Sequence, residues 1–143
     1  MVTSTATATW NGVLRSGNGE FSAGSGSFAG AYTFATRFEG TKGTNPEELI
    51  AAAQAACLSM ALSADLEKAR TPATSITTKA SCTMDMVEGA PWITKMELVV
   101  RGKVDGLDND GFVAAAERAK ENCPVSKALK GTVKFELDAA LED

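Results

Sequence analysis

The sequence has 143 residues, of which 44% are apolar and 22% are charged, and this is the composition of one globular domain rather than of a disordered chain. Fourteen Lys and Arg residues against eighteen Asp and Glu residues give a net charge of −4, so we expect neither nucleic acid nor an anionic membrane as a partner. The chain contains no histidine, which excludes a Ser-His-Asp triad, a Cys-His dyad and every metal site that needs imidazole.

The cysteine content and the absence of targeting patterns indicate a cytoplasmic protein. Cys57, Cys82 and Cys123 are too few, and odd in number, for a secreted disulfide framework. The N-terminal residues lack a signal-peptide pattern, and the longest apolar stretch, residues 49–62, is too short to span a bilayer. In a reducing compartment, a matched pair of cysteines is better suited to redox cycling than to a permanent crosslink.

The first 45 residues predict an antiparallel meander of short strands, because they hold eight of the thirteen glycines and alternate small polar with aromatic residues. Asn11-Gly12 is a hairpin signal, and the aromatic residues that follow, up to Phe34, mark further strands. Arg37 is then expected at a strand end, before a glycine turn.

A long helix is predicted to follow. Asn45 is suited to the N-cap, Pro46 to the first helical position and Glu48 to the third. From Leu49 to Leu66 the sequence is rich in Ala and apolar almost all round, which is typical of a helix buried in the middle of its domain.

The remaining pattern predicts two strands, two helices and a last strand. The strands are expected at residues 76–87 and 96–104 with a turn at Gly89-Ala90-Pro91, the helices at 108–121 and from Cys123-Pro124, and the last strand at 133–137. With connections of hairpin length, this order predicts an α+β fold with antiparallel sheets, in a single domain of residues 1–143.

The residues alone leave the candidate chemistry open. Cys57, in the most apolar helix, is expected to be a core residue that is inert unless a cation comes close, and Cys82 is also expected in the core. Cys123 precedes Pro124 and is either an incidental cap or a thiolate stabilised by the start of a helix. Arg37 could be a solvated surface charge.

Glu47 could be an ordinary first-turn acid of the long helix, where a negative charge is favourable in any case. The spacing along the chain does not bring these groups together.

Four blocks of sequence, taken together, resemble the osmotically inducible protein C (OsmC) family, of the OsmC and organic hydroperoxide resistance superfamily. The blocks are residues 36–40 (TRFEG), 43–49 (GTNPEEL), 55–62 (AACLSMAL) and 122–126 (NCPVS). The resemblance implies the fold of that family, in which antiparallel sheets surround a long central helix within an intertwined homodimer. It also implies a cytosolic enzyme that reduces organic hydroperoxides with a dithiol reductant, in defence against oxidative and osmotic stress.

Carried over to the matched positions, the resemblance implies a peroxidatic Cys57, a resolving Cys123, an Arg37 that stabilises the thiolate and a Glu47 that orients Arg37. No metal or other cofactor is expected, only an external thiol. The chain departs from the family pattern at Gln54, where many relatives carry His, and at Leu58, where many carry Phe. Two alternatives to the peroxidase remain, a general thiol–disulfide oxidoreductase and a non-catalytic dimeric ligand-binding protein.

The predicted helix also has a consequence for assembly. Glu47 and Cys57 are ten residues apart, which on a continuous helix is about 15 Å along the axis, and ten steps of about 100° leave them on different sides. The sequence therefore predicts sites shared across a twofold dimer, with Cys57 and Cys123 from one chain and Arg37 and Glu47 from the other.

Overall fold

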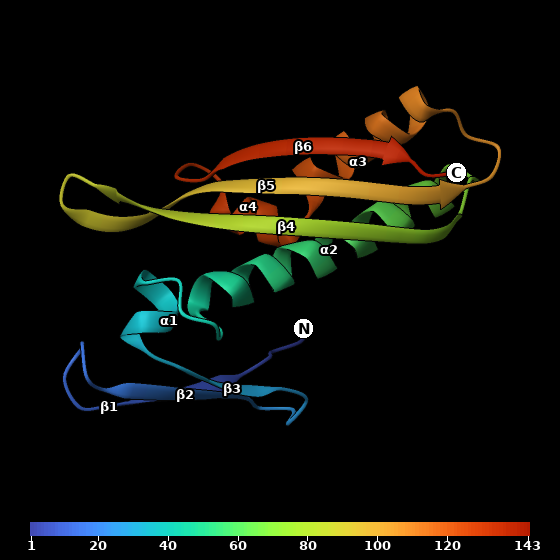
Figure 1. Ribbon diagram of the computed structural model, residues 1–143. Helices are drawn as coiled ribbons and strands as arrows, with labels where there is room; N and C mark the ends of the chain where they lie inside the picture. The colour runs from blue at the N-terminus through green and yellow to red at the C-terminus, as the bar shows by residue number, and fades with distance from the viewer. The chain divides into compact units, whose positions relative to one another are not determined.

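The computed structural model describes residues 1–143, which pack as two compact units, residues 1–49 and residues 50–143. In chain order the elements are three short strands, two helices, two long strands, two helices and a last strand (Figure 1). Strands and helices follow one another without the regular alternation of a parallel α/β protein, which confirms the α+β class.

The first unit contains the predicted antiparallel meander. Strands β1 (Ala6–Asn11), β2 (Asn18–Ala23) and β3 (Ala29–Tyr32) form a sheet in that order. Gly19 pairs with both Trp10 and Tyr32, whose ring centroids are 5.5 Å apart. A Cβ atom at Gly19 would lie 2.5 Å from the Tyr32 ring and 2.8 Å from the Trp10 ring, so only glycine lets the two rings meet over β2.

Helix α1 (Phe34–Phe38) follows β3 directly, so the prediction that Phe34 lies in a strand and Arg37 at a strand end is wrong. The helix begins at a capping box, in which Thr33 and Thr36 each accept a hydrogen bond from the other's backbone N–H, at 3.2 and 2.9 Å. The usual box has Glu or Gln at the third helical position, and a threonine there hides the signal in the sequence.

Helix α2 (Pro46–Lys68) begins as predicted, with Asn45 Oδ1 accepting a hydrogen bond from the Glu48 N–H at 2.8 Å. It is long and apolar enough to cross a membrane by length and composition alone, a test that the core helix of a soluble protein also passes. Within the second unit, α2 buries one side. Its buried positions within the second unit recur every fourth residue, at Gln54, Leu58, Leu62 and Leu66. Other positions, such as Ala52, Ala56 and Met60, are exposed.

The second unit contains a sheet with the strand order β4 (Ala73–Val87), β5 (Ala90–Val104) and β6 (Lys134–Leu141). Strands β4 and β5 form a hairpin whose turn is Glu88-Gly89, with φ values of 50° and 82°, as a type I′ turn requires. The turn is therefore shorter than predicted, and Pro91 lies inside the hairpin, opposite Met86.

Strand β6 pairs with β5 in parallel, which corrects the expectation of purely antiparallel sheets. Parallel neighbours need a crossover of about a dozen residues or more. Helices α3 (Asn109–Asn122) and α4 (Pro124–Leu129) supply this crossover.

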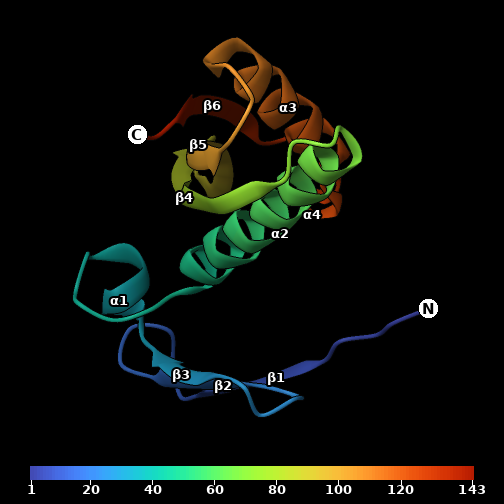
Figure 2. The ribbon, with the colours of Figure 1, turned by 90° about the vertical axis from the view of Figure 1, so that its right-hand side faces the viewer.

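Helices α2, α3 and α4 lie on the same face of this sheet (Figure 2), and the core fills the space between them and β5. Met96, Leu98 and Val100 alternate along β5 and are buried, as predicted. On β4, Cys82 packs against the core, but Met86 is 65% exposed, beyond a register shift between Thr83 and Met84. The core residues are Leu58, Leu62 and Leu66 of α2, Met96, Leu98 and Val100 of β5, Phe112, Ala115, Ala116 and Ala119 of α3, and Val133.

Candidate functional site

Two of the predicted site residues, Cys57 and Cys123, meet in the second unit. Cys57 lies near the middle of α2 and is partly exposed, whereas Cys123 is fully buried. Their sulfur atoms are 2.7 Å apart and share a hydrogen bond, although 66 residues separate them in the sequence. The fold therefore holds two thiols where one covalent bond could join them.

Cys123 owes its position to the junction of α3 and α4. Its backbone N–H donates to the Ala119 carbonyl at 2.8 Å and ends α3, and Pro124 then begins α4. Proline is favoured at the first helical position because it lacks the N–H that would otherwise be unpaired there and because its fixed φ suits the helix. The free N–H groups of Val125 and Ser126 then lie close enough to Cys123 to form hydrogen bonds with its sulfur.

The surroundings of the two thiols shift their pKa values in opposite directions. Burial, followed by the hydrogen bond with Cys123, raises the pKa of Cys57 above its ordinary value, and the Val125 N–H only partly offsets this. Burial also acts to raise the pKa of Cys123, but hydrogen bonds from Cys57, Ser126 and Val125 outweigh it, so this pKa is lowered. These directions make the buried thiol the more readily ionised of the two.

Two polar side chains beside Cys123 were given no role by the sequence predictions. Gln54 is fully buried, and its Nε2 atom donates to Ser126 Oγ at 2.8 Å and to Cys123 Sγ at 3.8 Å. Gln54 and Ser126 are 72 residues apart, so no local motif joins them. The sequence offers two signals, the departure from the family pattern at Gln54 and a polar residue on the face of α2 that Leu58 and Leu62 continue.

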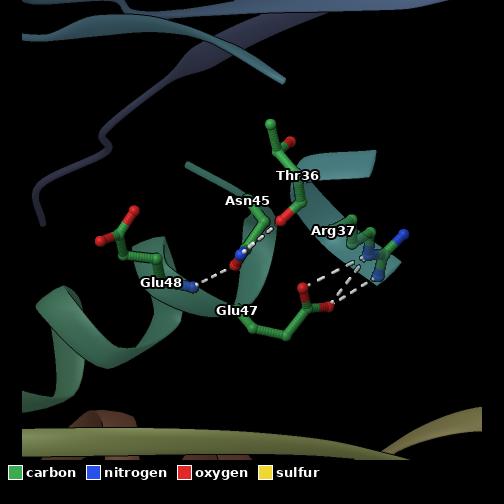
Figure 3. Close-up of polar contacts among 5 residues, drawn as sticks. All are labelled: Thr36, Arg37, Asn45, Glu47 and Glu48. Carbon is green, nitrogen blue, oxygen red and sulfur yellow. Dashed lines mark hydrogen bonds and ion pairs between the residues drawn. The ribbon is translucent and has the colours of Figure 1, made fainter. Parts of the chain in front are cut away.

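The other two predicted site residues, Arg37 and Glu47, form an ion pair in the first unit (Figure 3). Arg37 Nη2 donates to Glu47 Oε1 at 2.7 Å, and Arg37 Nε donates to both carboxylate oxygens at 3.2 and 3.3 Å. The Glu47 side chain is 9% exposed and that of Arg37 is 35% exposed. The carboxylate thus holds one edge of the guanidinium and leaves the Nη1 edge directed elsewhere.

Asn45 fixes the two helices that carry this ion pair. While its Oδ1 atom caps α2 through the Glu48 N–H, its Nδ2 atom donates to the Thr36 carbonyl in α1 at 3.3 Å (Figure 3). One side chain therefore links the residue before Arg37 to the residue after Glu47.

A cavity of about 400 Å³ lies beside Arg37 in the first unit. Aromatic side chains from β1, β3 and α1 form much of its wall, and Arg37 Cζ lies 5.2 Å from the centre of the Phe38 ring. The lining residues are Trp10, Gly12, Leu14, Tyr32, Thr33, Phe34, Arg37 and Phe38. The cavity can therefore hold an apolar group next to a cation.

The four predicted residues thus form two pairs, one in each unit. The thiols can exchange electrons through a disulfide, and the guanidinium can stabilise an anion. Nowhere in residues 1–143 do three or more Cys, Asp or Glu side chains converge on a common metal position.

Comparison with known proteins matches this chain to one family. The family described as OsmC-like protein matches residues 39–138, which include Glu47 and both thiols. Among curated proteins, the chain is 46% identical to "Peroxiredoxin OsmC" of Escherichia coli over 127 residues, covering 88% of this chain and 89% of the relative. It is also 31% identical to "Organic hydroperoxide resistance protein OhrA" of Bacillus subtilis over 100 residues, 69% of each chain.

Solved structures show the same fold. The crystal structure of an organic hydroperoxide resistance protein from Elizabethkingia anophelis superposes with a TM-score of 0.81 at 25% identity. The superposition covers 99% of this chain and 98% of the other.

Proposed function

This chain belongs to the OsmC-like protein family, and from that premise we propose that it is a thiol-dependent peroxidase that reduces organic hydroperoxides to alcohols. The observation that carries the proposal is the pair of thiols, Cys57 and Cys123, with sulfur atoms 2.7 Å apart. The relatives named as a peroxiredoxin and as an organic hydroperoxide resistance protein support the same activity rather than general disulfide exchange or simple ligand binding.

The difference in exposure between the two thiols supports a peroxidatic Cys57 and a resolving Cys123. Cys57 is partly exposed and can meet a substrate, whereas Cys123 is fully buried and contacts the Cys57 sulfur. The Cys57 thiolate attacks one peroxide oxygen, the O–O bond breaks, and the other oxygen leaves as an alkoxide that takes up a proton to give the alcohol. Cys57 is left as a sulfenic acid.

The second step closes the disulfide. The Cys123 thiolate attacks the Cys57 sulfur, the S–S bond forms, and the S–O bond breaks to release hydroxide, which becomes water. An external dithiol then restores both thiols by exchange, and the enzyme needs no further cofactor. We expect this cycle in the cytosol, where small dithiols are kept reduced.

Arg37 is the cation that Cys57 requires. Burial raises the pKa of Cys57, so a positive charge must offset that cost before the thiolate can form at neutral pH. Glu47 orients the guanidinium through its Nε and Nη2 edge, and the other edge is then available to the thiolate and the peroxide. The aromatic cavity beside Arg37 suits the organic part of an alkyl or lipid hydroperoxide.

We expect a homodimer in which Arg37 and Glu47 of the partner subunit complete each thiol site. The most apolar stretch of α2 has a mean hydropathy of 1.6, yet only 22% of it is buried, and Met60 on it is 77% exposed. Small exposed residues such as Ala52 and Ala56 would let two copies of α2 approach closely. If the two helices run antiparallel, the start of one lies beside the middle of the other.

Intact mass spectrometry tests the activity. Adding cumene hydroperoxide to the reduced protein should remove about 2 Da per chain as the disulfide forms, and peptide mapping should find Cys57 joined to Cys123. The Cys82→Ser variant should show the same mass change as the wild type, because the two sulfur atoms in contact are those of Cys57 and Cys123. An unchanged mass would overturn the proposed activity, and a main disulfide that includes Cys82 would overturn the assignment of the pair.

Subunit complementation tests the shared site. Inactive Cys57→Ser and Glu47→Ala proteins are unfolded and refolded together, which gives mixed dimers with one doubly defective site and one intact site. With random pairing, about one quarter of all sites should be active. If mixed dimers form and show no activity, the residues act within one chain.

A further inference from the structure

Gln54 is a polar residue on a face of α2 that is otherwise made of leucines. Its side chain is fully buried, and the next buried positions along the helix are Leu58 and Leu62. A buried amide costs free energy unless its donors and acceptor all find partners. The hydrogen bonds of the Gln54 side chain should therefore indicate its role.

Only the nitrogen of the Gln54 amide forms hydrogen bonds. The Nε2 group has two protons, and it donates to Ser126 Oγ at 2.8 Å and to Cys123 Sγ at 3.8 Å. The Oε1 atom is buried and has no hydrogen-bond partner. A residue selected for stability alone would be an apolar side chain of similar size, which leaves no acceptor unpaired. The amide nitrogen, which donates to the Cys123 sulfur and to Ser126, is therefore the part of the Gln54 side chain that forms hydrogen bonds.

Ser126 extends the same arrangement. Its backbone N–H and its hydroxyl both form hydrogen bonds with Cys123 that favour the thiolate. Because Ser126 Oγ accepts from Gln54, its own proton is free to point at the sulfur, and hydrogen bonds in such a chain strengthen one another. Gln54 thus acts on Cys123 both directly and through Ser126.

We propose that Gln54 is a positioning residue for the second chemical step, which holds Ser126 and the Cys123 thiolate in place for attack on oxidised Cys57. This inference rests on the proposed peroxidase cycle. In that step Cys123 supplies the electron pair for the new S–S bond, and the hydroxide that leaves Cys57 takes up a proton to become water. Gln54 gains and loses no bond, and its effect falls on how fast the sulfenic acid is converted to the disulfide.

The test separates the two steps in time. The reduced protein receives either one equivalent of cumene hydroperoxide, to follow the sulfenic acid (about +16 Da) and the disulfide (about −2 Da), or an excess, which supplies the second equivalent that the over-oxidised sulfinic acid (about +32 Da) requires. Samples are quenched in acid and read as intact masses. The variant Gln54→Leu keeps the volume of the side chain and removes the amide. The matched control is Leu62→Ile, a conservative change on the same buried face of α2, two turns further on.

In Gln54→Leu we expect the second step to slow about tenfold more than the first, because a hydrogen bond to a charged group is lost. The sulfinic acid should accumulate, and the melting temperature should stay the same or rise, since the unpaired Oε1 is gone. Leu62→Ile should show the wild-type ratio of the two rates. A residue with only a structural role would lower the melting temperature and leave the ratio of the rates unchanged.

Ser126→Ala keeps the inference falsifiable if Gln54→Leu does not fold. It should also slow the second step selectively, and in its background Gln54→Leu should cost less than it does alone. Wild-type ratios of the two rates in the variants that fold would overturn the inference. A wild-type protein that shows no oxidised mass at all would instead overturn the peroxidase cycle itself.

Discussion

The two reactive pairs of this protein are held together in different ways. Arg37 and Glu47 are ten residues apart, and a capping box and one asparagine side chain bring them together within the first unit. Cys57 and Cys123 are 66 residues apart and meet only because α2 and the junction of α3 with α4 pack on one face of the same sheet. The charge pair is therefore a local device, whereas the thiol pair depends on the whole core of the second unit.

Because of this difference, we expect substitutions at the two pairs to affect folding and chemistry to different extents. Glu47 is buried and Arg37 is 35% exposed, so deleting either charge leaves its partner unpaired and costs stability, whereas a substitution that keeps the charge, such as Arg37→Lys, should affect folding little and the chemistry strongly. Core packing sets the distance between the two thiols. A Cys→Ser substitution there replaces only the sulfur atom, so it tests the chemistry directly.

The largest effect is expected at the thiol pair. Cys57→Ser should abolish peroxidase activity, because a serine hydroxyl cannot replace the thiolate as nucleophile at neutral pH. Cys123→Ser should still consume one equivalent of hydroperoxide and then stop as a sulfenic acid, since the second thiol is missing. Quenched intact masses distinguish the two outcomes. Turnover in Cys57→Ser with a dithiol reductant would show that Cys57 is not the nucleophile.

At the charge pair, Arg37→Lys should lower the rate of the first step by on the order of 10²–10³, although the charge is retained. A lysine cannot be held on one edge by Glu47 and present a second edge to a thiolate and a peroxide. Arg101→Lys is the matched control, because Arg101 forms an ion pair of 3.0 Å with Asp138 and is similarly exposed. Near wild-type activity in Arg37→Lys would make Arg37 an ordinary surface charge.

The pH dependence of the first step should show that Arg37, of the charge pair, promotes the ionisation of Cys57, of the thiol pair. Because burial raises the pKa of Cys57 from its ordinary value of 9.0, the thiolate fraction without Arg37 should become complete only at more alkaline pH. The first step in Arg37→Ala should therefore keep rising with pH beyond 9.0, whereas the wild-type rate should level off at a lower pH. Stopped-flow rates against pH measure both profiles. Coincident midpoints would show that another group ionises Cys57.

The sequence predicts features that depend on local interactions, and it does not predict features that depend on contacts between distant residues. Asn45 and Pro46 identify the start of α2 because a cap acts within four residues. The sequence pattern does not predict the parallel pairing of β6, because a crossover built from two helices leaves no local signal of strand direction. Arg37 was placed at a strand end because Thr36 completes its capping box with an unusual residue.

The candidate site shows most clearly which contacts the sequence alone does not predict. The resemblance to a family identified Cys57, Cys123, Arg37 and Glu47 as candidates, and the structure brings them together as two pairs. No sequence pattern joins Gln54 to Ser126, because their contact exists only after α4 has packed against α2. Local signals thus predicted the elements, and contacts across 60 or more residues needed the structure.

The smallest expected effect concerns Asn45, which performs two tasks that two substitutions can separate. Asn45→Ala removes both the cap of α2 and the hydrogen bond to Thr36, whereas Asn45→Asp keeps the capping oxygen and removes only the Nδ2 donor. Asn45→Ala should lower the free energy of unfolding by about 1 kcal/mol, and Asn45→Asp should leave it nearly unchanged.

Both Asn45 variants should lose a few-fold in the rate of the first step, because α1 would no longer be tied to the start of α2 and Arg37 would be less firmly placed. Asp108→Ala is the control, since Asp108 caps α3 through the Gly111 N–H at 2.8 Å and lies far along the chain from Arg37. It should cost a similar free energy of unfolding and leave the rate of the first step unchanged. Denaturant unfolding and stopped-flow kinetics measure the two quantities. Full activity in Asn45→Asp would mean that the ion pair with Glu47 alone is enough to place Arg37, and that the bridge from Asn45 to Thr36 serves only the fold.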